Sequence, residues 1–155
     1  MAAALVVEEA KELACVLIPL AETHLLLPNV TIAEILPWRR IKPLQGAPKW
    51  CLGLLGWRGE TVPVIQFEAM NGGDMIGTPH NRCLLIMNRA RRANGRAFYG
   101  LASTGLPRIV HLSDDDLQNR SVRLGPAEVA ALNVGTETAV VPNLSYIEEQ
   151  LTMLP

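Results

Sequence analysis

The stretch GLLGWRGETVPVIQF, residues 53–67, contains two apolar runs that flank a polar tetrad, Trp57-Arg58-Gly59-Glu60. Glycine permits the positive φ of a tight turn, so Arg58-Gly59 predicts a hairpin that joins a strand over 51–57 to a strand over 61–67. In the second strand, Val62, Val64 or Ile65 is expected to enter a core. Trp57 either plugs the end of a barrel or enlarges a docking surface, and the sequence leaves both interpretations open.

Short apolar runs of strand length recur along the chain and are separated by turn-forming pairs such as Pro28-Asn29 and Asn94-Gly95. This pattern predicts an all-β fold, either a barrel or a sandwich. The two halves of the chain have a similar order of strands and turns, which favours two small barrels with a seam near the glycine-rich segment 70–80. The runs are residues 13–20, 24–28, 30–36, 51–57, 61–67, 82–87, 97–102 and 108–112.

Helix signals are few. Ser145 is the predicted N-cap of a helix over 145–151, because Glu148 completes a capping box and two apolar residues, Ile147 and Leu151, share one face. The acidic run before Leu117 predicts a short helical turn with its acidic residues near the N-terminus. Residues 1–12 are expected to form a lead-in to one domain over residues 13–155.

Composition excludes several classes of protein. The chain has 155 residues, 49% of them hydrophobic, and a net charge of −1, which indicates a globular protein and gives no reason to expect nucleic acid or an anionic membrane as a partner. Its three cysteines, Cys15, Cys51 and Cys83, form no CxxC pair and are expected to be buried free thiols. The N-terminus lacks the basic region of a signal peptide, and no apolar run is long enough to span a membrane. We therefore expect a cytoplasmic protein without membrane insertion.

Motifs that carry chemistry are missing from the sequence. The histidines are scattered, and the acidic run after Ser113 fails the EF-hand pattern, because Asn119 and Gly125 stand where glycine and glutamate are required. The glycines at 53, 56 and 59 match no phosphate-binding motif, and no nucleophile signature is present. The sequence predicts no metal, no cofactor and no enzymatic activity.

Basic residues beside aromatic residues offer two possible binding surfaces. Four arginines surround the expected hairpin at 94–95, close to Phe98 and Tyr99. This composition favours a hairpin tip that is simply solvated. The alternative is that the 89–96 hairpin binds RNA or an acidic protein. A second grouping, Trp38-Arg39-Arg40, has the composition of an interface hot spot, although the tryptophan could equally plug a barrel. The four arginines are Arg89, Arg91, Arg92 and Arg96.

The order of these segments resembles the CheW-like family of chemosensory coupling proteins. The resemblance rests on Glu34-Ile35, Pro48, Gly53, Arg58-Gly59 and Pro63-Val64-Ile65, which fit the family pattern G-x-x-x-x-RG-x-x-x-PVI and the strand before it, and it covers about residues 13–152. It implies an all-β fold of two intertwined five-stranded SH3-like barrels with a short C-terminal helix. It also implies a non-enzymatic adaptor between a chemoreceptor signalling tip and the regulatory domain of a CheA-like histidine kinase. Within the family, the chain resembles in general character the accessory, ChpC-like adaptors of type IV pilus (twitching) systems.

The resemblance also implies which residues bind partners. A receptor-facing groove would include Ile32 and Glu34, Arg58 at the turn, and Gly100 and Leu106 across the seam between the barrels. Ile32 and Leu106 would supply an apolar floor, Gly100 would allow close approach of a backbone, and Arg58 would pair with acidic or carbonyl groups. Trp57 replaces an aliphatic residue that is usual in the family, and Gln66 replaces an acidic one.

Overall fold

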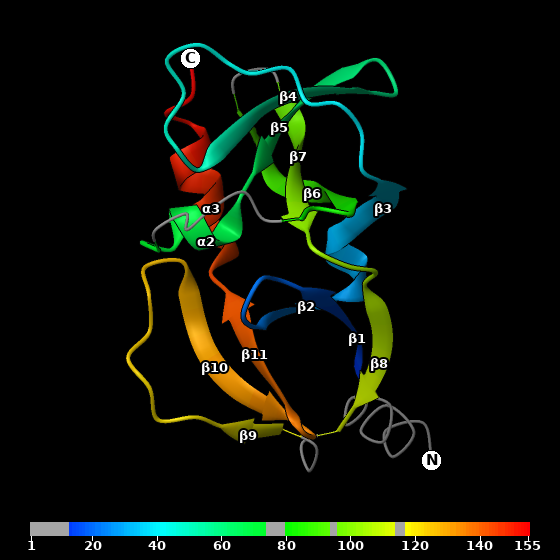
Figure 1. Cartoon of the computed structure of the whole chain (residues 1–155), viewed down its shortest axis with the longest axis vertical. Helices are drawn as coiled ribbons and strands as arrows, with labels where there is room; N and C mark the ends of the chain where they lie inside the picture. Colours follow the sequence, from blue (N-terminus) through cyan, green and yellow to red (C-terminus); the bar gives the residue numbers. More distant parts are fainter. Residues whose placement is uncertain (1–12, 74–79, 94–95, 114–116) are drawn as a thin grey trace.

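The computed structural model describes residues 13–73, 80–93, 96–113 and 117–155, and it confirms the predicted all-β fold (Figure 1). Strands form two sheets, and the C-terminal helix is short. None of the described helices is long and apolar enough to cross a membrane. The elements are β1 (Leu13–Pro19), β2 (His24–Pro28), η1 (Asn29–Thr31), β3 (Ile32–Pro37), β4 (Cys51–Trp57), β5 (Glu60–Ile65), α2 (Phe67–Met70), β6 (Cys83–Ala93), β7 (Arg96–Ser103), β8 (Arg108–Leu112), β9 (Leu117–Asn119), β10 (Glu128–Val134), β11 (Glu137–Pro142) and α3 (Leu144–Leu151).

The two sheets form two small barrels that are stacked along the long axis of the molecule (Figure 1). Barrel A has the strand order β8-β1-β2-β11-β10-β9, and barrel B has the order β3-β6-β7-β5-β4. The chain starts in barrel A, builds all of barrel B, and returns, so the barrels are intertwined as predicted. Barrel A has six strands rather than the expected five, because the short strand β9 adds to its edge.

The chain crosses between the barrels at two places. One is η1, between β2 and β3, and the other is the segment 104–107, between β7 and β8. The glycine-rich segment that the sequence placed at the seam follows α2 and leads to β6, and the strands before and after it, β5 and β6, both belong to barrel B. Residues 74–79 of that segment lie outside the described part of the chain.

Three apolar clusters fill the molecule, one inside each barrel and one between them. Along β1, Cys15 and Leu17 face the interior of barrel A, whereas Val16 and Ile18 face the central cluster. On β5, Val64 faces the interior of barrel B and Ile65 the central cluster. Both faces of these strands are therefore buried, which explains why their sequences are continuously apolar rather than alternating.

The hairpin predicted from Arg58-Gly59 is confirmed. Strands β4 and β5 pair antiparallel up to Trp57 and Glu60, and both central residues have positive φ, 46° at Arg58 and 75° at Gly59. Positive φ at both central positions is the geometry of a type I′ turn, whose twist matches that of the flanking strands. The second predicted turn, Asn94-Gly95, lies outside the described residues, although β6 and β7 pair antiparallel on either side of it.

One local prediction about helices is wrong. Helix α3 begins at Leu144, and its N-cap is Asn143, whose side-chain oxygen accepts a hydrogen bond from the backbone N–H of Tyr146 at 3.1 Å. Ser145 therefore lies inside the first turn instead of capping it, although Ile147 and Leu151 are both buried. The acidic run 114–116, where the sequence predicts a short helical turn, lies outside the described residues; Leu117 after it begins strand β9, which pairs with β10.

Candidate functional site

A hydrogen-bonded cluster, which we call the Glu34 clasp, joins Glu34, Trp57 and Arg58 at the seam where the two outer strands of barrel B face each other. Glu34 lies on β3 and Trp57 ends β4, and these strands are the two outer strands of the sheet. Trp57 Nε1 donates to Glu34 Oε2 at 3.1 Å, and Arg58 Nη2 donates to Glu34 Oε1 at 2.7 Å. Because β3 and β4 share no strand pairing among the described residues, these side-chain bonds join the two edges of the sheet.

The indole of Trp57 is the fixed part of the clasp. Its side chain belongs to the apolar cluster inside barrel B, and the residue is only 8% exposed. The ring of Phe98 meets it edge to face, with the ring centroids 4.9 Å apart and the planes at 69°. Trp57 therefore plugs the barrel, and only its N–H is directed to the carboxylate of Glu34.

Arg58 is the solvent-facing part of the clasp. Its side chain is 70% exposed, and the guanidinium carbon lies 5.2 Å from the centroid of the Trp57 ring, within cation–π range. Among the described residues, Arg58 is the single non-glycine residue with positive φ. Asparagine, aspartate and glycine are the residues favoured there, so the turn itself does not explain an arginine, and strained positions of this kind concentrate at functional sites.

The pKa of the Glu34 carboxyl is lowered from its ordinary value of 4.5. The hydrogen bond from Trp57 is the largest cause; the hydrogen bond and charge of Arg58 and the charge of Arg39 act in the same direction, while partial desolvation opposes them. The ionised form of Glu34 is therefore favoured by folding.

Glu34 is expected to make stability depend on pH. Because its pKa is lower in the folded than in the unfolded protein, its contribution to stability is present above pH 4.5 and is lost as the pH falls through the lowered folded value. The free energy of unfolding should therefore be higher for the wild type than for Glu34→Gln at neutral pH, and the difference should shrink on acidification. Urea unfolding of both proteins over a series of pH values measures it, and a difference that is constant with pH would contradict the assignment.

Of the other three residues expected at the binding groove, Ile32 lies two residues before Glu34 on β3, whereas Gly100 and Leu106 lie on other segments. Ile32 is half-buried against the central cluster, and Leu106 is 79% exposed on the segment that crosses to barrel A. Gly100 lies in the same row of paired residues as Glu34, with Ile86 between them, about 10 Å away across two strand spacings. A Cβ atom at Gly100 would lie 3.3 Å from Val64 Cγ2, so the glycine makes room for packing inside barrel B.

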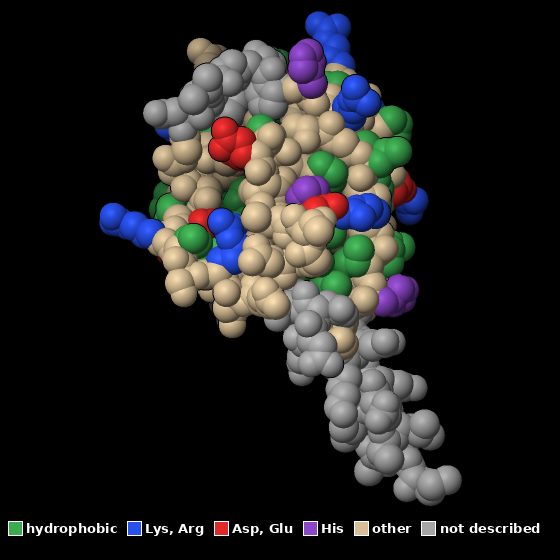
Figure 2. Space-filling model, turned by 60° about the horizontal axis from the view of Figure 1, so that its bottom comes forward, with side chains coloured by type: hydrophobic (Ala, Val, Ile, Leu, Met, Phe, Trp, Pro, Cys, Tyr) green, Lys and Arg blue, Asp and Glu red, His purple; other side chains and the backbone are tan. Residues whose placement is uncertain are grey.

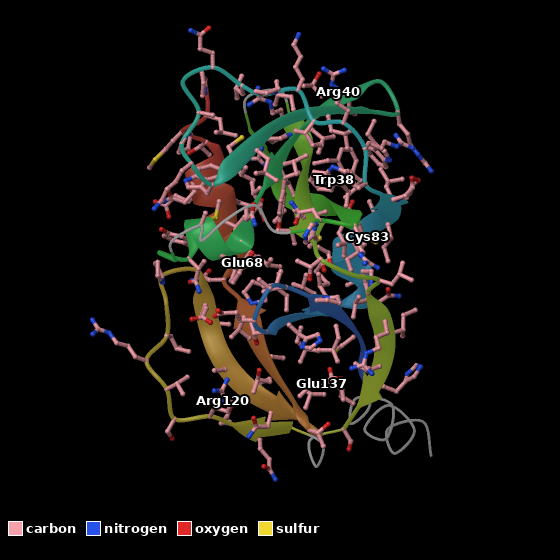
Figure 3. The ribbon with its side chains drawn as sticks, in the orientation of Figure 1. Trp38, Arg40, Glu68, Cys83, Arg120 and Glu137 are labelled. Atoms are coloured by element: carbon pink, nitrogen blue, oxygen red, sulfur yellow. The ribbon has the colours of Figure 1, made fainter. Side chains whose placement is uncertain are left out.

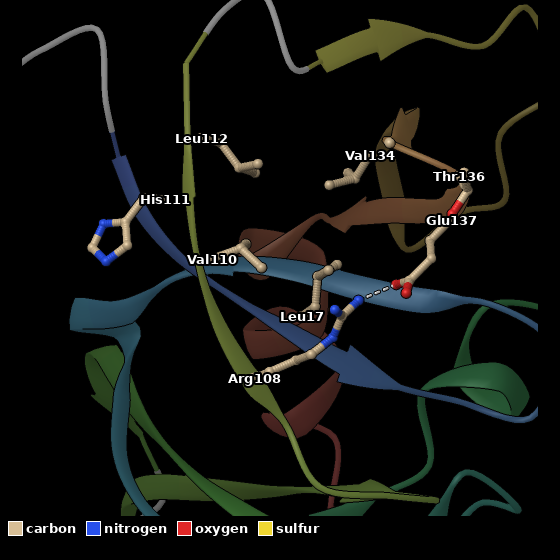
Figure 4. Close-up of a pocket in the computed structure, with 9 residues that line it drawn as sticks. Leu17, Arg108, Val110, His111, Leu112, Val134, Thr136 and Glu137 are labelled. Carbon is tan, nitrogen blue, oxygen red and sulfur yellow. Dashed lines mark hydrogen bonds and ion pairs between the residues drawn. The ribbon is translucent and has the colours of Figure 1, made fainter.

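Barrel A has an ion pair of its own, between β8 and β11, which the sequence did not reveal. Arg108 on β8 donates to the carboxylate of Glu137 at the start of β11 (Figure 4). His24 Nε2 lies 3.5 Å from the same carboxylate. A cavity of about 430 Å³ opens beside this pair, between β8 and the β10–β11 turn. Its apolar walls come from Leu17, Val110, Leu112 and Val134. No sequence motif links these residues, because they meet only when the barrel closes.

The described residues contain no cluster of metal-binding side chains, and their cysteine thiols are of low reactivity. No group of three His, Cys, Asp or Glu side chains in the described part of the chain could hold a metal ion. All three cysteines are free thiols, and burial raises the pKa of each, which disfavours the reactive thiolate. On the face shown in Figure 2, the charged side chains are scattered and of both signs.

The basic hairpin of β6 and β7 is partly integrated into the fold. Arg89 is half-buried, and burial lowers the pKa of its guanidinium, while Arg96 Nη2 donates to the backbone oxygen of Pro155 at 3.4 Å.

Trp38 and Arg40 lie on the barrel B half of the molecule, whereas Arg120 and Glu137 lie on barrel A (Figure 3). Trp38 is 38% exposed, so it remains accessible from solvent.

Comparison with known proteins identifies the family. The model of the CheW-like domain matches residues 14–149. The fold is similar to the crystal structure of scaffolding protein TtCheW from Thermoanaerobacter tengcongensis, with a TM-score of 0.66 and 17% sequence identity over 84% of this chain and 88% of that one. No curated protein matches the sequence. The match to the family model over most of the chain, on a fold of two intertwined barrels, shows that the protein belongs to the CheW-like domain family.

Proposed function

We propose that the protein is a cytoplasmic, non-enzymatic adaptor that couples a chemoreceptor to a CheA-like histidine kinase in bacterial chemotaxis or twitching motility. The observation that carries this proposal is the family match over residues 14–149. Two barrels that share a central core form a rigid body, and such a body suits a scaffold that transmits a signal through protein contacts. Receptor proteins of a pilus system encoded beside this gene would assign the pathway to twitching motility.

Arg58 is the proposed centre of the receptor contact. Its Nε and Nη1 groups have no protein partner in the described part of the chain, so they are available to an acidic or carbonyl group of a receptor tip. The proposed surface also includes Glu34 and Trp57 of the clasp, the half-buried Ile32, and the exposed Leu106 on the crossing segment 104–107; Gly100 supports the sheet. RNA binding through the 89–96 hairpin is less favoured, because Arg89 and Arg96 are partly buried.

Co-purification tests the adaptor function directly. The folded protein is expected to capture at least one of two partners from the same organism, the regulatory domain of the kinase or a soluble fragment with the receptor signalling tip, with a micromolar dissociation constant for the receptor. Failure of the folded protein to capture either partner contradicts the proposal. Binding of RNA that weakens steeply with salt would instead support the basic hairpin as the functional surface.

Arg58→Glu is expected to weaken receptor capture about tenfold or more, because it removes a charge-assisted hydrogen-bond donor and puts a negative charge in its place. Circular dichroism should show an unchanged fold, and titration calorimetry with the receptor fragment measures the affinity. Arg58→Asn is the second variant, because asparagine suits the positive φ of this position and removes the charge without adding repulsion to Glu34.

The matched control for this prediction is Arg123→Glu, which makes the same change of charge at an exposed residue between β9 and β10. Equal loss of affinity in the Arg123 and Arg58 variants would show that only net charge matters, and it would remove Arg58 from the proposed site.

A further inference from the structure

Arg58 is already paired in the isolated protein. A carboxylate on a partner must therefore compete with Glu34 Oε1, which accepts a hydrogen bond from Arg58 Nη2 at 2.7 Å. If Arg58 were the only group that balances the charge of Glu34, its transfer to a partner would leave this carboxylate without a hydrogen-bonded donor at the barrel seam.

The two oxygens of Glu34 are held by two different residues. Oε1 contacts Arg58, whose side chain is 70% exposed, and Oε2 contacts Trp57, which is 8% exposed and packed against Phe98. The indole cannot follow a partner, because it fills the interior of the barrel, whereas the guanidinium lies on the solvent side of the ring. An aliphatic residue at position 57 would fill similar space but would leave Oε2 without its donor.

We infer that Trp57 is a positioning residue that retains Glu34 at the seam while Arg58 moves from Glu34 to a carboxylate of the bound partner. The partner is thereby specified as an acidic side chain, because a guanidinium pairs with a carboxylate through two parallel hydrogen bonds. The inference rests on the proposed adaptor function for the identity of the partner. The holding of the two Glu34 oxygens by two different residues, Trp57 and Arg58, is a property of the free protein.

The first test needs no partner and follows the Glu34 carboxyl by NMR titration in the free protein. Trp57→Phe retains an aromatic ring and removes only the N–H donor, whereas Arg58→Ala removes the guanidinium. The pKa of Glu34 is expected to rise in Trp57→Phe, whereas in Arg58→Ala it should stay below its ordinary value, because the indole N–H still donates to Oε2. No rise in Trp57→Phe, or a return to the ordinary value in Arg58→Ala, would overturn the inference, because Glu34 would then depend on Arg58 alone.

The second test measures affinity for the receptor fragment. Trp57→Phe is expected to weaken binding about two- to tenfold, the range of one hydrogen bond, because Glu34 then competes more strongly for Arg58. Adding Glu34→Gln to that variant should tighten binding relative to Trp57→Phe alone, since the charge that competes for Arg58 is gone. A purely structural role for Trp57 predicts no such tightening.

Trp50→Phe is the matched control, because Trp50 is also 8% exposed but lies in the central cluster, away from the clasp. It should leave the affinity unchanged. If the wild type binds the fragment and Trp57→Phe binds equally well, or if adding Glu34→Gln to Trp57→Phe does not tighten binding, the inference is wrong. If the wild type captures neither receptor nor kinase, the proposed function fails, while the NMR titration still decides the role of Trp57.

Discussion

Trp57→Ala is expected to lower the free energy of unfolding by about 3–5 kcal/mol, the range for large-to-small substitutions of buried aromatic residues. The side chain fills the interior of barrel B among Leu55, Val62 and Ile86, and Phe98 packs against its ring. Removing it leaves a cavity and also breaks the hydrogen bond to Glu34 that joins the sheet edges. Urea unfolding followed by circular dichroism measures the loss, because it does not depend on the missing fluorophore.

Trp38→Ala is the control for this prediction. Trp38 directly follows β3 and is 38% exposed, so its removal creates no closed cavity, and the expected loss is below about 1 kcal/mol. Similar losses in the two variants would show that barrel B tolerates an open end, and the plugging role of Trp57 would have to be abandoned.

Gly53→Ala is expected to lower the free energy of unfolding by about 2–4 kcal/mol through overpacking and backbone strain. A Cβ atom at this position would lie 2.1 Å from the carbonyl oxygen of Lys42, and the φ of 140° is rarely adopted by residues with a side chain. Lys42 also exchanges two backbone hydrogen bonds with Leu54, at 2.9 and 2.7 Å, and a displacement of the segment would break both. Thermal and urea unfolding report the change.

Gly56→Ala provides the comparison on the same strand. A Cβ atom at Gly56 meets no heavy atom within 4 Å, so alanine should leave stability nearly unchanged or slightly raised. Equal destabilisation by both substitutions would indicate that β4 requires glycine for flexibility in general, and the steric explanation for Gly53 would fail.

Much of the fold could be predicted because strands that are buried on both faces are continuously apolar, as in β1 and β6. The hairpin of β10 and β11 was missed, although Gly135 has a φ of 62° in its turn. The sequences of these strands, EVAALNV and ETAVVP, contain alanine, glutamate and asparagine, which have little intrinsic preference for a sheet. Their pairing with β2 and β9 supplies the stability that local preference lacks.

The members of the candidate site could be named from the sequence, but their connections could not. Glu34 lies 24 residues from Arg58 on a strand at the opposite edge of the same sheet, and the two meet only because the sheet closes. The same reason hid the pair of Arg108 and Glu137. Sequence reasoning treated Arg58 as a charge held for a partner, whereas the structure pairs it within the chain, and Trp57 proves to plug the barrel.

The insertion of barrel B between β2 and β8 has a consequence for synthesis of the chain. All strands of barrel B lie between Ile32 and Ser103, so they leave the ribosome together and can pair early. Strand β1 can pair with β2 as soon as both have emerged, but the other edge of β1 must wait for β8, and the other edge of β2 for β11, near the end of the chain. The apolar segment LACVLIP therefore lacks its full packing until late in translation, which makes it a part of the nascent protein that needs protection from aggregation.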